Sequence, residues 1–239
     1  MKCKGNVATM SEQLAEEHLL LVEEIRKQIN TDHSQRVLER ILRLAKFQLA
    51  PAVKVCKELD RIWKELEVIT DEKILEEVDT HKLVFGGKDN QGRRIIHFYY
   101  KLHDPKQFSI ENTLKFFLLM MDIALDEVDV QDHGIAMICW MAGSGWNNFD
   151  FASEKAFTDL FNSFDPLSLN MLSKMYLVDS PWYVWVAMKL MRPFITEETY
   201  KKIETISSQQ LHAMFSADQL QENSIFKDTL RSSTSPKWH

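Results

Sequence analysis

Residues 174–206 read KMYLVDSPWYVWVAMKLMRPFITEETYKKIETI, and this stretch decides the fold of the chain. The alternating apolar residues of Lys174 to Val178 predict a half-buried strand, and Asp179-Ser180-Pro181 predicts a turn. The ten residues from Trp182 to Met191 carry a single charge, and Arg192-Pro193 ends the run. Apolar side chains cover nearly the whole circumference of this predicted helix, so we expect apolar material on both of its sides.

Three arrangements suit a helix of this kind. A transmembrane span needs about 20 apolar residues, roughly twice this run, and is therefore excluded for it. Burial between a sheet and other helices is one explanation. A mobile lid is the other: its inner face would cover an apolar cavity, while Trp182 and Tyr183 enter a membrane interface, where such rings are favoured. Lys189 and Arg192 would suit an anionic lipid surface, although ordinary solvation explains each cation taken alone.

Three short motifs in this stretch occur in a fixed order. They are Val178-Asp179-Ser180-Pro181, Arg192-Pro193-Phe194-Ile195 and Lys202-Ile203. Together they resemble the lipid-binding core of the Sec14-like, or CRAL-TRIO, proteins. The resemblance implies that the apolar helix is the gate over a lipid pocket, because members of that family bind or exchange single lipids. Upstream, the dipeptides Lys46-Phe47 and Trp63-Lys64 are similar to dipeptides that occur in the same order in the family's N-terminal helical module.

Patterning and resemblance together predict an α/β fold, with an N-terminal helical module followed by a mixed β-sheet whose helices form a hydrophobic lipid pocket. The expected units are a helical module at 10–75, an α/β lipid-binding domain at 80–215 and a loosely held polar tail at 216–239. Periodicity predicts strands at 83–85, 95–100, 134–140, 174–178 and 202–206, helices at 109–129, 153–164, 182–191 and 208–215, and an acidic connector at 71–80. The turn Asp89-x-x-Gly92-Arg93 predicts a hairpin between the first two strands.

Composition limits the function. The chain has 239 residues, 45% of them apolar, and a formal charge of −6, which gives no support to nucleic-acid binding. Its three widely spaced cysteines fit neither a disulfide framework nor a zinc cluster, and the N-terminus has no apolar signal region. We therefore expect a cytoplasmic protein that associates peripherally with membranes.

The residues that could form catalytic or cofactor-binding motifs do not have the spacing that those motifs require. Ser144 lies between two glycines, but a nucleophile elbow needs glycine where Ala142 and Trp146 stand. Gly143-x-Gly145 lacks the third glycine of a dinucleotide loop. The histidines have no metal-ligand spacing. We expect no enzyme, no metal and no cofactor other than a bound lipid.

The predicted function is binding of one phospholipid or other lipophile and its exchange or presentation at a transiently bound membrane. Lys202 is the expected head-group contact, and Trp182, Tyr183, Lys189 and Arg192 are the expected lid and membrane contacts. The pocket is expected to be lined by Phe117, Met121, Met137, Phe157, Phe161, Met175, Leu177, Trp185, Met188 and Phe194.

A second function stays open on the same fold. The chain is also similar to the BCH domains, protein-interaction scaffolds that bind small GTPases or their regulators, in which the pocket is filled or lost. Two departures from the lipid-binding pattern favour this alternative: Asn170 stands where inositide-binding members have a glutamate, and the usual Gly-Gly ending is absent after Phe215. The first departure also argues against inositide recognition.

Overall fold

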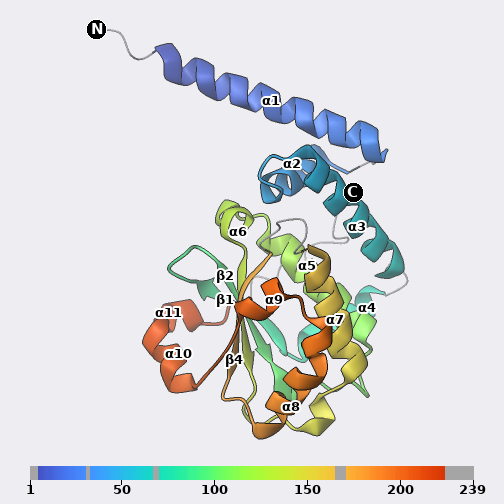
Figure 1. The fold of residues 1–239 in the computed structure, drawn as a ribbon, viewed down its shortest axis with the longest axis vertical. Coiled ribbons are helices and arrows are strands. Elements are labelled where there is room, and N and C mark those ends of the chain that lie inside the picture. Colours follow the sequence, from blue (N-terminus) through green and yellow to red (C-terminus); the bar gives the residue numbers. More distant parts are fainter. Residues whose placement is uncertain (1–4, 31–32, 67–69, 165–170, 224–239) are drawn as a thin grey trace.

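A five-stranded mixed sheet forms the centre of the molecule (Figure 1). The computed structural model describes residues 5–30, 33–66, 70–164 and 171–223. The strands, in sheet order, are β1 (Leu83–Lys88), β2 (Arg94–Tyr99), β3 (Ile135–Trp140), β4 (Leu172–Val178) and β5 (Ile203–Ile206). β1 pairs antiparallel with β2 and all later pairs are parallel, so the predicted α/β fold with a mixed sheet is confirmed.

The β1–β2 connection is the predicted hairpin. The Asp89 carboxylate accepts hydrogen bonds from the backbone N–H groups of Gln91 and Arg93, which closes the turn. Gly92 adopts φ of 79°, a backbone conformation that glycine reaches without steric cost. Arg94 donates to Glu127 and to the Gly86 carbonyl and so fixes the first residue of β2.

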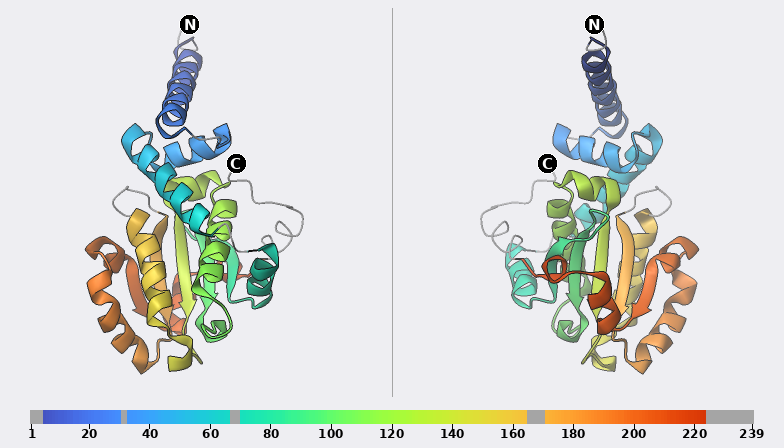
Figure 2. Two further views of the ribbon diagram at one scale, coloured as in Figure 1. Left: turned by 90° about the vertical axis from the view of Figure 1, so that its right-hand side faces the viewer. Right: turned by 90° about the vertical axis from the view of Figure 1, so that its left-hand side faces the viewer.

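Helices cover both faces of the sheet (Figure 2). One face packs against α5 (Ile110–Ala124), α7 (Phe151–Phe164) and α8 (Trp182–Met191), and the other against α10 (Ser208–Met214) and α11 (Ala217–Leu220). Because both faces are covered, the parallel strands need apolar residues at nearly every position, as the run in β3 shows. The predicted helix at 182–191 is confirmed as α8 with the same bounds.

The N-terminal helices lie beyond one end of the sheet, and α1 extends away from it (Figures 1 and 2). They are α1 (Gly5–Ile29), α2 (Gln35–Leu44) and α3 (Leu49–Leu66). Arg40 of α2 is buried, and its guanidinium contacts Asp122 and Asp126, each with an N–O distance of 2.6 Å. This ion-pair cluster fastens the helical module to the end of α5.

Three sequence predictions about elements were wrong. The acidic segment at 71–80 is a helix, α4 (Asp71–Asp79), because Ile74 and Val78 bury one of its sides. The helix predicted at 109–129 ends at Ala124, and α6 (Val128–His133) follows it. In the first part of the expected loose tail, residues 216–223, α11 forms and Asn223 pairs with Phe85 of β1, while residues 224–239 lie outside the described residues. The side chain of Trp63 and all of Asn170 lie outside the described residues.

Candidate functional site

A cavity of about 120 Å³ lies between the sheet and helices α7 and α8. The register of the parallel strands builds its floor, since residues at matched positions point to the same face. Phe98, Cys139 and Leu177 are register partners across β2, β3 and β4, and all three line the cavity. A second row, Met137, Met175 and Ile203, crosses β3, β4 and β5 in the same way.

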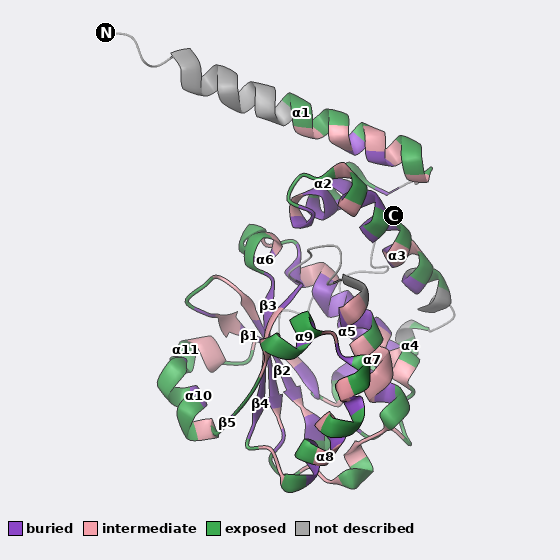
Figure 3. Ribbon diagram, in the orientation of Figure 1, coloured by how far each residue is buried: buried purple, intermediate pink, exposed green. Residues whose placement is uncertain are grey.

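Helix α8 forms part of the roof and has two different faces. Tyr183, Val184, Ala187, Met188 and Met191 line the cavity. The opposite face carries exposed apolar side chains, with Trp182 74% and Trp185 64% exposed. Figure 3 shows this division as alternating buried and exposed segments along the helix. The apolar circumference read from the sequence therefore serves the cavity on one side and faces outward on the other.

Both ends of α8 are attached to neighbouring elements. Before the helix, Asp179 has φ of 51°, its N–H donates to the Ile206 carbonyl at 3.0 Å, and its carboxylate accepts from the Ser208 N–H at 2.8 Å. After the helix, the Asn162 side chain of α7 donates to the Phe194 carbonyl at 2.6 Å. The Asp-Ser-Pro turn and the Arg-Pro-Phe step are thus the two attachment points of the helix.

Polar groups gather near the carboxyl ends of β2 and β3. Tyr100 follows β2 and donates its hydroxyl to Glu154 in the first turn of α7. His103 is buried beside Tyr100, with ring centroids 6.0 Å apart, and its Nδ1 has no hydrogen-bond partner within the described chain. Tyr100, His103 and Glu154 all line the cavity. The apolar chamber therefore has one polar end.

Burial sets the protonation of this polar end. Desolvation raises the pKa of the Glu154 carboxyl above its ordinary value, although the hydrogen bond from Tyr100 opposes that shift. Desolvation, and to a smaller extent the charge of Lys82, lower the pKa of His103 to about 4. The imidazole is therefore neutral at physiological pH.

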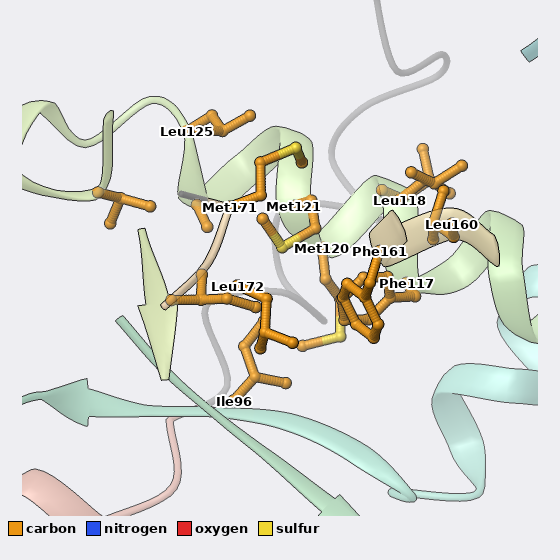
Figure 4. Close-up of a cluster of buried hydrophobic side chains, with 14 of the residues drawn as sticks. Ile96, Phe117, Leu118, Met120, Met121, Leu125, Leu160, Phe161, Met171 and Leu172 are labelled. Atoms are coloured by element: carbon orange, nitrogen blue, oxygen red, sulfur yellow. The ribbon is translucent and has the colours of Figure 1, made fainter. Parts of the chain in front are cut away.

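The structure places six of the ten predicted pocket residues in the cavity lining: Met137, Phe157, Phe161, Met175, Leu177 and Met188. Phe117 and Met121 lie in the packed core instead. Figure 4 shows the Phe117 ring against Phe161, with centroids 5.6 Å apart. Trp185 and Phe194 lie outside the cavity and are exposed.

The predicted outward orientation of Tyr183 was wrong. It was expected on the outer face with Trp182, but it is buried, and its hydroxyl meets Ser144. Lys189 and Arg192 lie on the outer side, where Lys189 Nζ stacks over the Trp185 ring at 3.6 Å and Arg192 pairs with Glu197. Lys202, the predicted head-group contact, is half-buried at the end of α9 (Glu197–Lys202), beside the cavity residue Ile203.

Sequence reasoning missed the polar lining. Glu154 stands one turn before Phe157 and two turns before Phe161, so helical spacing already placed it on the face of α7 that holds both predicted pocket residues. His103 carries no such signal, because it follows a short 3₁₀ turn (Tyr100–Leu102) and no periodicity orients its side chain.

The cavity size limits what fits without movement. A cavity of about 150 Å³ in an engineered protein holds a benzene molecule. At about 120 Å³, this chamber holds a group of roughly that size. A longer lipophile requires displacement of a wall, and α8 is the wall with an exposed outer face.

Comparisons with known proteins agree with this geometry. The CRAL/TRIO domain family matches residues 79–224. Clavesin-1 of Rattus norvegicus is 25% identical over 134 residues, which cover 53% of this chain and 36% of clavesin-1. Clavesin-2 of Homo sapiens is 24% identical over 120 residues, or 48% of this chain and 35% of clavesin-2. The crystal structure of Sfh5 superposes with a TM-score of 0.51 at 14% identity, covering 86% of this chain and 82% of Sfh5.

The family match spans more than half of the chain, so the protein belongs to the CRAL/TRIO domain family, as the motifs predicted. Membership in this family supports the binding of lipophilic molecules in general. The likeness to Sfh5 adds the fold alone. The aligned part is about a third of the length of the clavesins.

Proposed function

We propose that the protein binds a single hydrophobic ligand, a phospholipid or another lipophile, beneath α8, and that α8 moves as a lid to exchange or present the ligand at membranes. The two-faced character of α8 carries this proposal, because its inner side chains line an apolar cavity while its outer rings remain exposed. Each methylene buried there contributes about 0.8 kcal/mol, so about ten of them supply roughly 8 kcal/mol against the cost of ordering the ligand.

The membrane contact is an exposed apolar rim formed by α8, the first residue of α7 and two short 3₁₀ turns. It consists of Trp146, Phe151, Trp182, Trp185, Leu190 and Phe194. Ring contacts join its parts, with centroids 6.4 Å apart for Trp146 and Trp182 and 5.5 Å apart for Phe151 and Phe194. Lys155 and Lys189 lie over rim rings and supply cations for an anionic surface.

None of the helices in the described residues is long and apolar enough to cross a membrane. We propose transient, peripheral contact from the cytoplasm, made by the rim. Lys202 is the proposed contact for a head group that emerges near α9. We propose no catalytic role for the site. A scaffold with a filled pocket fits less well, because a chamber lies under α8.

Transfer of a labelled lipid between donor and acceptor vesicles tests the proposal. Ala187 lines the cavity on α8, and Ala187→Phe fills the chamber; we expect this change to abolish most transfer. Ala213, exposed on α10, provides the matched control, since Ala213→Phe adds the same ring far from the cavity. Equal transfer by the two variants, both folded by circular dichroism, would refute a ligand site under α8.

A further inference from the structure

Within the described chain, the cavity lining carries a carboxyl group and no cationic side chain. Glu154 is the carboxyl group in the lining, and no lysine or arginine lines the chamber among the described residues. An enclosed phosphate would therefore lose its hydration without meeting a cation, which is costly in a medium of low polarity. It would also face the carboxyl group. The chamber disfavours an enclosed anionic group.

The same end of the chamber offers unused hydrogen-bonding capacity. A carboxyl group can accept through both of its oxygens, so the bond from Tyr100 leaves acceptor capacity open on Glu154. The imidazole of His103 is 2% exposed and lines the cavity, and its Nδ1 is buried without a partner in the described chain. A buried polar atom without a partner destabilises the protein until a partner is supplied. A ligand group that both donates and accepts would satisfy both residues.

Two sets of hydrogen bonds hold these groups in place. Asn148 donates to the carbonyls of Lys101 and His103, which fixes the turn that carries the imidazole. Asp150 accepts from the N–H and hydroxyl of Ser153, which caps the first turn of α7 beside Glu154. The polar end is therefore organised before any ligand arrives.

We propose that the ligand is a neutral lipophile whose enclosed end carries a hydroxyl group, which donates to Glu154 and accepts from His103. This inference rests on the proposed lipid-binding function and specifies its ligand class. A lipid with its phosphate inside the chamber is excluded by the same arrangement. A hydroxyl group satisfies both residues without bringing a charge.

Three probes of matched length test the inference on the full chain: decanol, its isomer nonyl methyl ether, and decyl phosphate. Isothermal titration should give decanol an affinity about tenfold above that of the ether, which cannot donate, and further above that of the phosphate. Glu154→Leu removes the acceptor and should reduce the preference for alcohol over ether to about twofold or less. Glu154→Gln keeps an acceptor and should retain most of it.

The failures are distinguishable. Equal or tighter binding of decyl phosphate, or an alcohol preference unchanged in Glu154→Leu, overturns this inference and leaves lipid binding intact. Absence of binding by all three probes overturns the proposed function and this inference with it. Tyr100→Phe is the control, because it removes the hydrogen bond from Tyr100 to Glu154 but keeps the carboxyl group. This variant should keep the preference for alcohol over ether. That result would show that a change in Glu154→Leu does not arise from loss of the Tyr100 bond.

Discussion

The hydroxyl of Tyr183 lies 2.5 Å from Oγ of Ser144, and this contact joins the first turn of α8 to the loop that follows β3. Ser144 also donates to the Met141 carbonyl at 2.5 Å, so its oxygen is held in place to accept from the tyrosine. One hydrogen bond thus fastens the proposed lid to the rim of the sheet, at the end of the cavity where the polar groups lie.

Removing this bond should free the lid. We expect Tyr183→Phe to release a bound fluorescent fatty ligand roughly fivefold faster, because one buried hydrogen bond contributes about 1 kcal/mol to the closed state. Stopped-flow measurement of release would show this. Tyr176→Phe is the matched control, since Tyr176 is buried on the opposite face of the sheet. Unchanged release from Tyr183→Phe would show that this contact does not restrain α8.

The exposed rim should determine vesicle binding. Replacing Trp182 and Trp185 by serine removes two rings that insert at a membrane interface, and we expect at least a tenfold weaker partition onto anionic vesicles in a flotation assay. Leu20→Ser on α1 removes an equally accessible apolar side chain far from the cavity and should change little. Equal losses for the two variants would argue against membrane contact through α8.

The raised pKa of Glu154 should appear as pH-dependent stability. Tyr100, Tyr183, Cys139 and Asp150 interact electrostatically with this carboxyl group, yet burial is the largest cause of its shift. Ionising it in the folded state costs free energy, so wild-type stability falls as pH rises from the ordinary value of 4.5 through the higher folded pKa.

We therefore expect Glu154→Gln to be more stable than wild type near pH 8, with the difference vanishing toward pH 4.5. Urea unfolding of both proteins across this range measures the effect. A difference independent of pH would mean that the folded-state pKa of Glu154 is unshifted.

Breaking a buried ion pair should cause a larger loss of stability than the other proposed substitutions. The side chains of Lys82 and Glu77 are both fully buried, with Nζ 2.5 Å from Oε2, and Thr113 bonds to each of them. Lys82→Met leaves the carboxylate buried without its cation, so we expect a loss of about 3–5 kcal/mol in the free energy of unfolding. The double change with Glu77→Leu should recover part of this loss. A loss in the double variant equal to the sum of the single losses would show that the pair is not coupled.

Much of the fold follows from sequence patterns. The apolar run of β3 predicts a strand covered on both faces, and the turn and Arg-Pro step predict the bounds of α8. These features are local, because each depends on a few residues of fixed chemistry. The α5–α6 break at Ala124 was missed because Leu125 and Val128 continue the helical spacing across it.

The orientation of side chains was less predictable. Since α8 is apolar all round, its pattern does not say which residues face the cavity, and Tyr183 was assigned to the wrong side. Helical spacing places Glu154 on the face of α7 that holds Phe157, but it does not show that this face lies opposite the floor formed by Phe98 and Leu177. Such a site depends on tertiary packing, which no local period encodes.

Native mass spectrometry of the protein purified from cells without detergent tests the central claim most directly. We predict one lipophile bound per chain, and its loss in Ala187→Phe. A chain that carries no lipophile, and takes none up during incubation with vesicles of total cell lipids, would contradict it.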